Sequence, residues 1–153
     1  MIPSEYETQL HHRILLVERS RLAAEALIFA LDSDPTLDAV GYALGPCEAL
    51  ELATSLSPDS VLVGELPSQP EVVQAIHARF PRMRLIVLRE RLVPIEVNEL
   101  YAAGAAEVLE TSCSADELLH AIAAARRRQL VFERGERRRL AGLRLVHRGA
   151  QSA

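Results

Sequence analysis

The sequence predicts an α/β fold, a doubly wound (βα)5 sandwich built around a five-stranded parallel sheet. Three observations carry this prediction. Apolar runs of strand length recur at regular intervals, segments with helical periodicity separate them, and the runs are wholly apolar, as strands covered on both faces are. With 153 residues, of which 49% are hydrophobic, the chain is long enough for one compact domain with a core.

Five apolar runs are the predicted strands. They are Arg13–Val17, Ala39–Ala43, Ser60–Val63, Leu85–Leu88 and Glu107–Leu109. In an open parallel sheet, ligands bind beyond the carboxyl ends of the strands. The residues that directly follow these runs are therefore the candidates for chemistry.

The segments between and after these runs are predicted to be amphipathic helices. They are Ser20–Leu31, Pro46–Leu56, Gln69–Phe80, Pro94–Ala103 and Ser114–Arg128. In the first helix, the apolar residues near one stripe are Leu22, Ala26, Phe29 and Ala30. The last begins with Ser114 as N-cap and Glu117 three residues on, which is a capping box. The alternation of strands and helices is that of a flavodoxin-like sandwich.

Charge is distributed unevenly along the chain. All 17 basic residues are arginine; residues 1–125 hold 8 of them against 19 acidic residues, a net charge of −11, and residues 126–153 hold 9 against 2, a net charge of +7. We therefore expect one domain over residues 12–128, followed by a basic C-terminal extension over residues 129–153 that is a linker or a partner-binding tail.

Several classes of protein are disfavoured by what the sequence lacks. No apolar run approaches the roughly 20 residues of a membrane span, and the N-terminus does not have the layout of a signal peptide, so we expect a cytoplasmic protein without a membrane partner. Cys47 and Cys113 are far apart and have no neighbouring cysteine, which disfavours a zinc site or a disulfide framework. No grouping of nucleophile and base suggests an enzyme.

Three segments carry a resemblance to a known family. Pro58–Val63 is one, Ala78–Pro81 before Arg84–Leu88 is the second, and Ala102–Leu109 followed by Ser114–Leu119 is the third. In this order and spacing, the chain resembles the receiver domain of bacterial two-component response regulators, especially the NarL-like class, over about residues 12–128. Receiver domains of this kind take part in phosphorelay signal transduction and transcription regulation.

The resemblance implies a phosphoryl-transfer site at the strand ends, made of two acids that hold Mg²⁺, an acceptor aspartate, a hydroxyl group and a lysine. The matching positions here are Glu18 and Arg19, Gly64, Arg89, and Thr111. A glycine has no side chain to phosphorylate, and a shift of one residue would offer only Glu65 as an acceptor. The sequence therefore predicts an atypical, degenerate pseudo-receiver, with no magnesium site and no other cofactor.

The charged residues at these strand ends have three interpretations. In the first, Arg19 and Arg89 simply pair with acids across the sheet edge. In the second, Arg89 fixes the shape that phosphorylation would otherwise switch. In the third, Arg19 and Arg89 form a site for an anion or a nucleotide-like ligand, since guanidinium groups suit phosphate and carboxylate.

We predict a phosphorylation-independent regulatory protein that acts by protein–protein interaction, with itself or with another protein. The predicted partner-binding face comprises Glu96, Leu100, Tyr101, Val108 and His120. The alternative is a DNA-associated transcriptional regulator whose basic tail contacts phosphates through Arg137, Arg138 and Arg139, or a truncated NarL-like regulator that lacks its helix-turn-helix.

Overall fold

The computed structural model describes residues 11–128 of the chain. Five strands form in the predicted places, with ends that differ by no more than two residues from those expected. They are β1 (His12–Val17), β2 (Leu37–Ala43), β3 (Ser60–Val63), β4 (Arg84–Arg89) and β5 (Glu107–Glu110). The prediction of five strands is confirmed.

The helices also follow the sequence pattern. They are α1 (Arg21–Asp32), α2 (Pro46–Leu56), α3 (Gln69–Arg79), α4 (Pro94–Ala103) and a last helical segment over residues 115–128. Ser20 is the N-cap of α1, and its side chain accepts a hydrogen bond from the backbone N–H of Ala23. The capping box predicted for the last helix is present, because Ser114 and Glu117 exchange hydrogen bonds of 3.1 and 3.3 Å.

All five strands are parallel, in the order β2-β1-β3-β4-β5. The chain runs outward from β1 to β2 and then returns to the other side of β1 for β3. The order therefore reverses between β1 and β3, which pair with Val17 opposite Val63. Such a switch point opens a crevice beyond the carboxyl ends of these two strands. The residues that follow Val17 and Val63 are Glu18 and Gly64.

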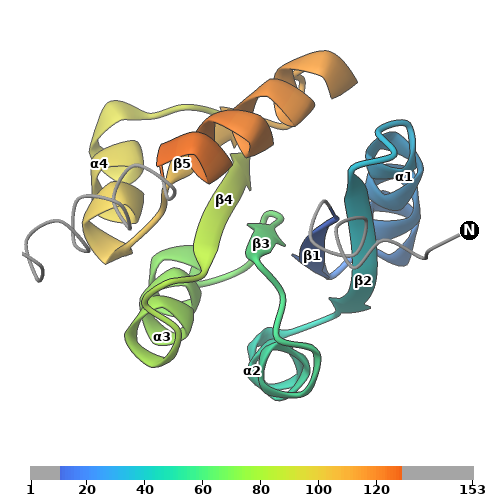
Figure 1. Ribbon diagram of the computed structural model, residues 1–153. Coiled ribbons are helices and arrows are strands. Elements are labelled where there is room, and N and C mark those ends of the chain that lie inside the picture. Colours follow the sequence, from blue (N-terminus) through green and yellow to red (C-terminus); the bar gives the residue numbers. More distant parts are fainter. Residues whose placement is uncertain (1–10, 129–153) are drawn as a thin grey trace, which may run out of the picture.

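Helices cover both faces of the sheet (Figure 1). One layer, made of α2, α3 and α4, packs on residues such as Leu15, Val61 and Val87. The other layer, made of α1 and the 115–128 helix, packs on Ile14 and neighbouring strand residues that point the opposite way. Burial on both faces explains why the strands are wholly apolar. The flavodoxin-like sandwich is confirmed.

The stripe predicted for α1 is not the one that packs on the sheet. Leu22 and Phe29 are 77% and 82% exposed, whereas Ala24 and Leu31 are fully buried. The helix carries apolar residues on two opposite faces, and periodicity alone does not say which of them meets the sheet. The face with Leu22 and Phe29 is therefore an outer surface of the molecule.

Two residues of the predicted partner-binding face lie in the core. Leu100 of α4 is fully buried and Val108 of β5 is 7% exposed, and both pack in the layer formed by α2, α3 and α4. The prediction that they contact a partner is wrong, because α4 turns Leu100 toward the sheet and β5 is covered on that face. Glu96, Tyr101 and His120 remain on the surface.

Within residues 11–128, no helix has the length and apolar character needed to cross a membrane. Arg137, Arg138 and Arg139, the residues predicted to contact nucleic acid, lie outside the described residues, as does the rest of the 129–153 extension.

Candidate functional site

Glu18 is the first residue after β1, and its side chain is turned into the crevice at the switch point. The residue is only 8% exposed. Its backbone N–H donates to the carbonyl of Ala43 at 2.9 Å, which continues the pairing of β1 with β2. Its Oε1 accepts a hydrogen bond of 3.0 Å from the N–H of Ser20, the cap of α1. The backbone of Glu18 is thus fixed by β2, and its carboxylate by the N-terminus of α1.

Gly64 is the first residue after β3 and lies directly against Glu18. Its N–H donates to the carbonyl of Val17 at 2.7 Å, so the backbone is fixed beside β1. A Cβ atom placed on Gly64 would stand 2.8 Å from Cδ of Glu18 and closer still to Oε2. Real Cβ atoms do not approach other atoms so closely. The carboxyl group of Glu18 therefore fills the space that a side chain at position 64 would need.

Gln69 is a residue of this site that the sequence did not reveal. It begins α3, yet it is 1% exposed. Its Nε2 donates to the carbonyl of Gly64 at 2.7 Å and to the carbonyl of Leu88 at 3.0 Å. These two carbonyls close the ends of neighbouring strands, so Gln69 joins β3 to β4. Its remaining Oε1 faces Arg89.

Arg89 ends β4 and connects Gln69 to the helix that follows. Its Nη1 donates to Oε1 of Gln69 at 3.2 Å, and its Nη2 forms a short charged hydrogen bond with Oε2 of Glu96 on α4. The Arg89 side chain is 18% exposed and that of Glu96 is 44% exposed, so the ion pair is shielded from water on the arginine side only. A continuous chain of side chains therefore runs from Gly64 to α4.

The other predicted residues are placed at the rim of the same edge. Glu65 accepts a hydrogen bond of 3.0 Å from the backbone N–H of Glu90, which ties the loop after β3 to the loop after β4. Thr111 is exposed, and its N–H donates to the carbonyl of Arg89 at 2.8 Å. Neither residue takes part in the Gln69–Arg89 chain through its side chain.

The sequence predicted that Arg19 and Arg89 pair with acids across the sheet edge, and the structure gives a different partner for Arg89 and none for Arg19 among residues 11–128. Arg89 is neutralised by Glu96 of α4 and by no acid that follows a strand. Arg19 is exposed, and among residues 11–128 its side chain makes no hydrogen bond or ion pair. The guanidinium of Arg89 already bonds to Gln69 and Glu96, so only Arg19 would be available to a bound anion.

The donor set at this edge does not suit magnesium. Mg²⁺ is held in proteins by one or more carboxylates with further oxygen ligands in octahedral geometry. Here Glu18 already accepts from Ser20, Gly64 offers no side-chain oxygen, and the neighbouring side chain is the cation Arg19. Within residues 11–128, no three His, Cys, Asp or Glu side chains are grouped as a metal site.

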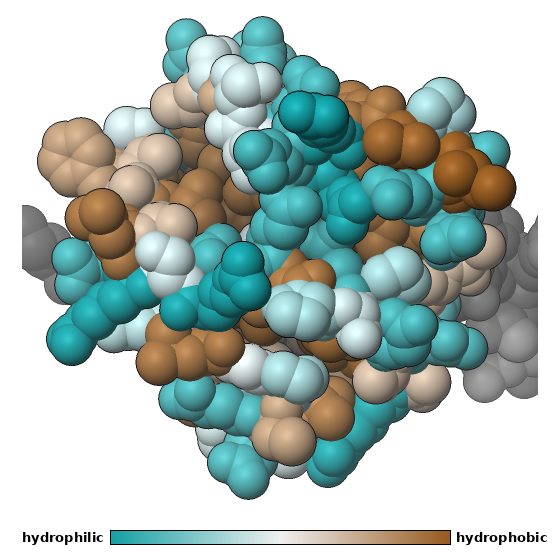
Figure 2. Space-filling view, turned by 180° about the vertical axis from the view of Figure 1, so that it is seen from behind, coloured by the Kyte–Doolittle hydropathy of each residue, from teal (hydrophilic) through white to brown (hydrophobic). Residues whose placement is uncertain are grey.

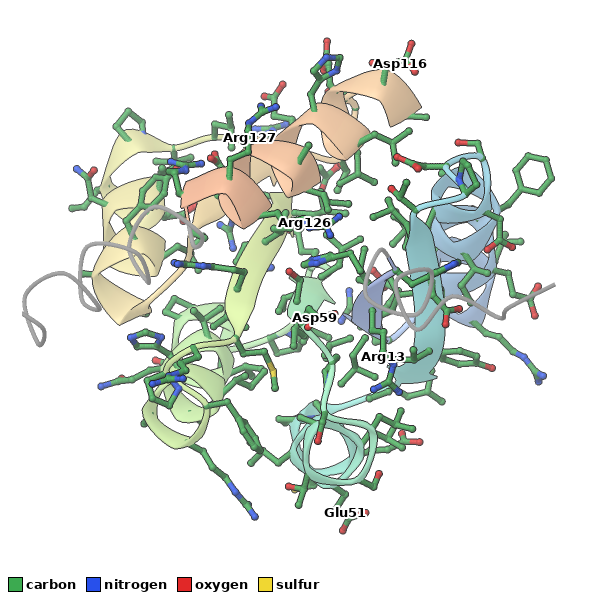
Figure 3. All side chains as sticks on the ribbon, viewed as in Figure 1. Arg13, Glu51, Asp59, Asp116, Arg126 and Arg127 are labelled. Atoms are coloured by element: carbon green, nitrogen blue, oxygen red, sulfur yellow. The ribbon has the colours of Figure 1, made fainter. Side chains whose placement is uncertain are left out.

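The amino edge of the sheet holds a second polar cluster, visible around Asp59 and Arg13 in Figure 3. Asp59 accepts from the N–H of Arg13 at 2.8 Å, and the buried imidazole of His12 shares a hydrogen bond of 2.7 Å with Ser60. Burial lowers the pKa of His12; the Asp59 carboxylate opposes this shift and Arg126 adds to it. This cluster joins β1 to β3 at the end opposite Gly64.

Comparison of the sequence with known proteins gives one curated relative. No family model matches the chain. The relative is "Protein-glutamate methylesterase/protein-glutamine glutaminase 3" of Anaeromyxobacter dehalogenans (strain 2CP-C), 33% identical over 106 residues. The match covers 63% of this chain and 30% of the relative, so the chain spans about a third of that protein's length.

The matches to solved structures cover a larger share of both chains. The response regulator domain of Thermotoga maritima CheB is 27% identical, with a TM-score of 0.68 over 75% of this chain and 96% of that one. The signal receiver domain of the putative response regulator NarL from Mycobacterium tuberculosis is 23% identical, with a TM-score of 0.70 over 76% and 97% of the two chains. Both matches cover nearly all of the solved chain and about three quarters of this one.

Proposed function

Residues 11–128 form a receiver domain of two-component response regulators, and from this premise we propose that the domain signals without phosphorylation, by binding another protein. The observation that carries the proposal is the contact between Glu18 and Gly64. In this family the residue that ends the third strand accepts the phosphoryl group, and here that position has no side chain. The carboxylate of Glu18 occupies the space instead.

The second support is the state of Arg89. At the position where the family carries a hydroxyl, this chain carries a guanidinium that bonds to Gln69 on one side and to Glu96 on the other. In the family, the hydroxyl responds to the phosphoryl group and the segment after the fourth strand follows. Here α4 is joined to the buried Gln69 by a permanent charge, which favours a single position of α4. The arginine therefore replaces a switch by a fixed link.

The surface that this link supports is the outer side of α4. Glu96 belongs to both the link and the surface, and Tyr101 is 45% exposed on the same helix. Ile95, 68% exposed, adds an apolar side chain at the first turn of α4. His120 is exposed and donates through Nδ1 to the carbonyl of Asp116 at 2.9 Å. We place the protein-binding face here.

Intact mass measurement tests the first half of the proposal. The protein is incubated with Mg²⁺ and a small phosphodonor such as acetyl phosphate, and we expect no gain of a phosphoryl group. The matched control is a phosphorylatable receiver treated in the same tube. A phosphoryl adduct that disappears in Glu65→Gln would assign an acceptor to Glu65 and overturn the proposal.

Hydrogen exchange tests the link between Arg89 and α4. Replacing Arg89 by Thr removes both bonds to Gln69 and Glu96, and we expect the amides of α4 to exchange about tenfold faster while those of α2 are unchanged. Arg91→Thr is the control, because Arg91 is exposed and lies two residues further along the same loop. Equal protection of α4 in both variants would show that Arg89 does not hold the helix.

A further inference from the structure

The face of α1 that points away from the sheet carries exposed apolar side chains. Leu22 and Phe29, seven residues apart on one side of the helix, are 77% and 82% exposed. In Figure 2, apolar side chains gather at the left-hand edge of the molecule, which α1 forms. Single exposed apolar residues are normal on a protein, whereas apolar side chains gathered into one patch are candidates for a contact surface.

The shape of this face suits a second copy of the same helix. Between Leu22 and Phe29 lies Ala26, which is exposed, and Ala23 and Ala30 lie on one flank at intermediate exposure. Two copies of α1 packed antiparallel and crossing near Ala26 bring Leu22 of each copy over the turn that holds Ala30 of the other. Phe29 then meets Ala23 of the other copy. Leu22 of each copy also lies at nearly the same height as Phe29 of the other, so these two large side chains pack against each other on both sides of the crossing point, and the small Ala26 lets the two helices approach closely.

The charges on the other flank are complementary in the same arrangement. Arg21 lies at the start of α1 and Asp32 at its end, and both are exposed on the flank opposite the alanines. A twofold axis through the crossing point places Arg21 of each copy beside Asp32 of the other, twice over. Arg21 already pairs with Glu25 in its own helix at 3.5 Å, so Glu25 does not enter the interface as an uncompensated charge.

We propose that α1 is a self-association surface, on which two copies of this chain pack in an antiparallel, isologous pair through Leu22, Ala26 and Phe29, with Arg21 and Asp32 forming reciprocal ion pairs at its ends. The surface lies on the α1 side of the sheet, whereas the protein-binding face proposed above is built on α4. A dimer of this kind leaves both α4 helices free for a partner. The inference does not depend on whether the domain accepts a phosphoryl group.

Sedimentation velocity of the full chain over a range of concentrations tests the association itself. We expect a reversible dimer, and a dissociation constant at least tenfold higher in Phe29→Glu and Leu22→Glu. Since both side chains are exposed, the urea unfolding midpoint of these variants should stay close to that of the parent. Ile95→Ala, at an apolar residue of α4 that is 68% exposed, is the control and should dimerise like the parent.

A charge swap tests the orientation. Arg21→Glu and Asp32→Arg should each weaken the dimer severalfold, and the double variant should recover affinity, because the swapped charges again face each other. A parallel pair of helices would show no such rescue. A protein that is monomeric at all concentrations, or a dimer that survives Phe29→Glu and is lost in Ile95→Ala, would overturn the proposal.

Cross-linking provides a readout that does not depend on affinity. With Cys47 and Cys113 replaced by Ser, Ala26→Cys should form a disulfide-linked dimer under mild oxidation, since position 26 lies at the crossing point. Glu51→Cys, exposed on α2, is the matched control and should remain monomeric under the same conditions. Equal cross-linking at both positions would indicate random collision and contradict the assigned interface.

Discussion

The two edges of the sheet both carry buried polar side chains, but the hydrogen bonds of these side chains go to different kinds of partner. At the amino edge, Asp59 and Arg13 bond to backbone groups of β1 and of the end of α2, and His12 bonds to Ser60 one strand away. Every partner there belongs to an element that the core already fixes. At the carboxyl edge, by contrast, the bonds pass through side chains, from Gly64 through Gln69 and Arg89.

A charge at the amino edge therefore affects stability alone, whereas a charge at the carboxyl edge also affects the position of a helix. The hydrogen bonds at the amino edge join β1 to β3, and these strands cannot move apart without unfolding the sheet. At the carboxyl edge, the hydrogen bonds lead to Glu96 of α4. A loop separates this helix from β4, so the helix can shift relative to the strand. Loss of a link at the first edge should appear in unfolding alone. Loss at the second should also appear in the mobility of α4.

The largest expected effect is at Gly64. Gly64→Asp restores the acceptor residue in name, but its side chain must enter the space of the Glu18 carboxyl group. The carboxyl group of Glu18 is buried and bonded to the N–H of Ser20, so it must either leave its site or share it with a second carboxylate. We therefore expect a loss of about 3 kcal/mol in the free energy of unfolding. Urea denaturation measures it, and Gly45→Asp is the control, because a Cβ at Gly45 meets nothing within 4 Å.

A double variant shows whether Glu18 is the cause. Adding Glu18→Ala to Gly64→Asp should return part of the stability, with a coupling energy above about 1 kcal/mol. Strictly additive losses would mean that the carboxyl group of Glu18 does not occupy the space beside Gly64 in solution.

Gln69 should give the next largest effect. Gln69→Leu keeps the volume but leaves the carbonyls of Gly64 and Leu88 and one face of Arg89 without partners, so we expect a loss of about 2–3 kcal/mol. Gln74→Leu, exposed on the same helix, should lie within about 0.5 kcal/mol of the parent. Similar unfolding midpoints for the two variants would contradict a structural role for Gln69.

The sequence predicted the sheet well because burial on both faces leaves a strong local signal. Ser60–Val63 has the predicted bounds, and the register of its neighbours follows from the same apolar runs. It also placed Glu18, Gly64 and Arg89 at one edge, since the carboxyl ends of parallel strands meet there. These are consequences of the strand pattern and need no knowledge of side-chain packing.

What the sequence missed depends on contacts between elements. Gln69 is polar and begins a helix, a combination that is ordinarily exposed, and only the approach of α3 to the ends of β3 and β4 buries it. The pair of Arg89 with Glu96 depends on the path of the loop between them. For α1, two apolar faces competed, and the choice was made by packing on the sheet. Local periodicity carries none of this information.

A pH titration probes the amino edge. Burial lowers the pKa of His12 in the folded protein below the value of about 6.5 expected in the unfolded chain. As pH falls below about 6.5, the unfolded chain takes up the proton first, so the stability present above that pH is lost. We expect His12→Gln to flatten the decline in unfolding free energy between about pH 7.5 and pH 5.5. His120→Gln, at an exposed position, should leave it unchanged.

The smallest effect expected is at two serines that share one backbone conformation on opposite edges. Ser57 and Ser68 have φ angles of 47° and 56°, in the left-handed region that glycine adopts without strain. Replacing either by Gly relieves about 1 kcal/mol of strain, offset in part by the greater freedom of Gly in the unfolded chain, so each variant should gain less than about 1 kcal/mol. Urea denaturation of the two variants side by side measures the gains. Ser68 directly precedes Gln69, whereas Ser57 precedes the strand that bears Ser60. Equal gains in the two variants would show that the two edges differ through their side chains and not through these backbone positions. A loss of stability confined to Ser68→Gly would mean that the backbone before α3 also holds Gln69 in position.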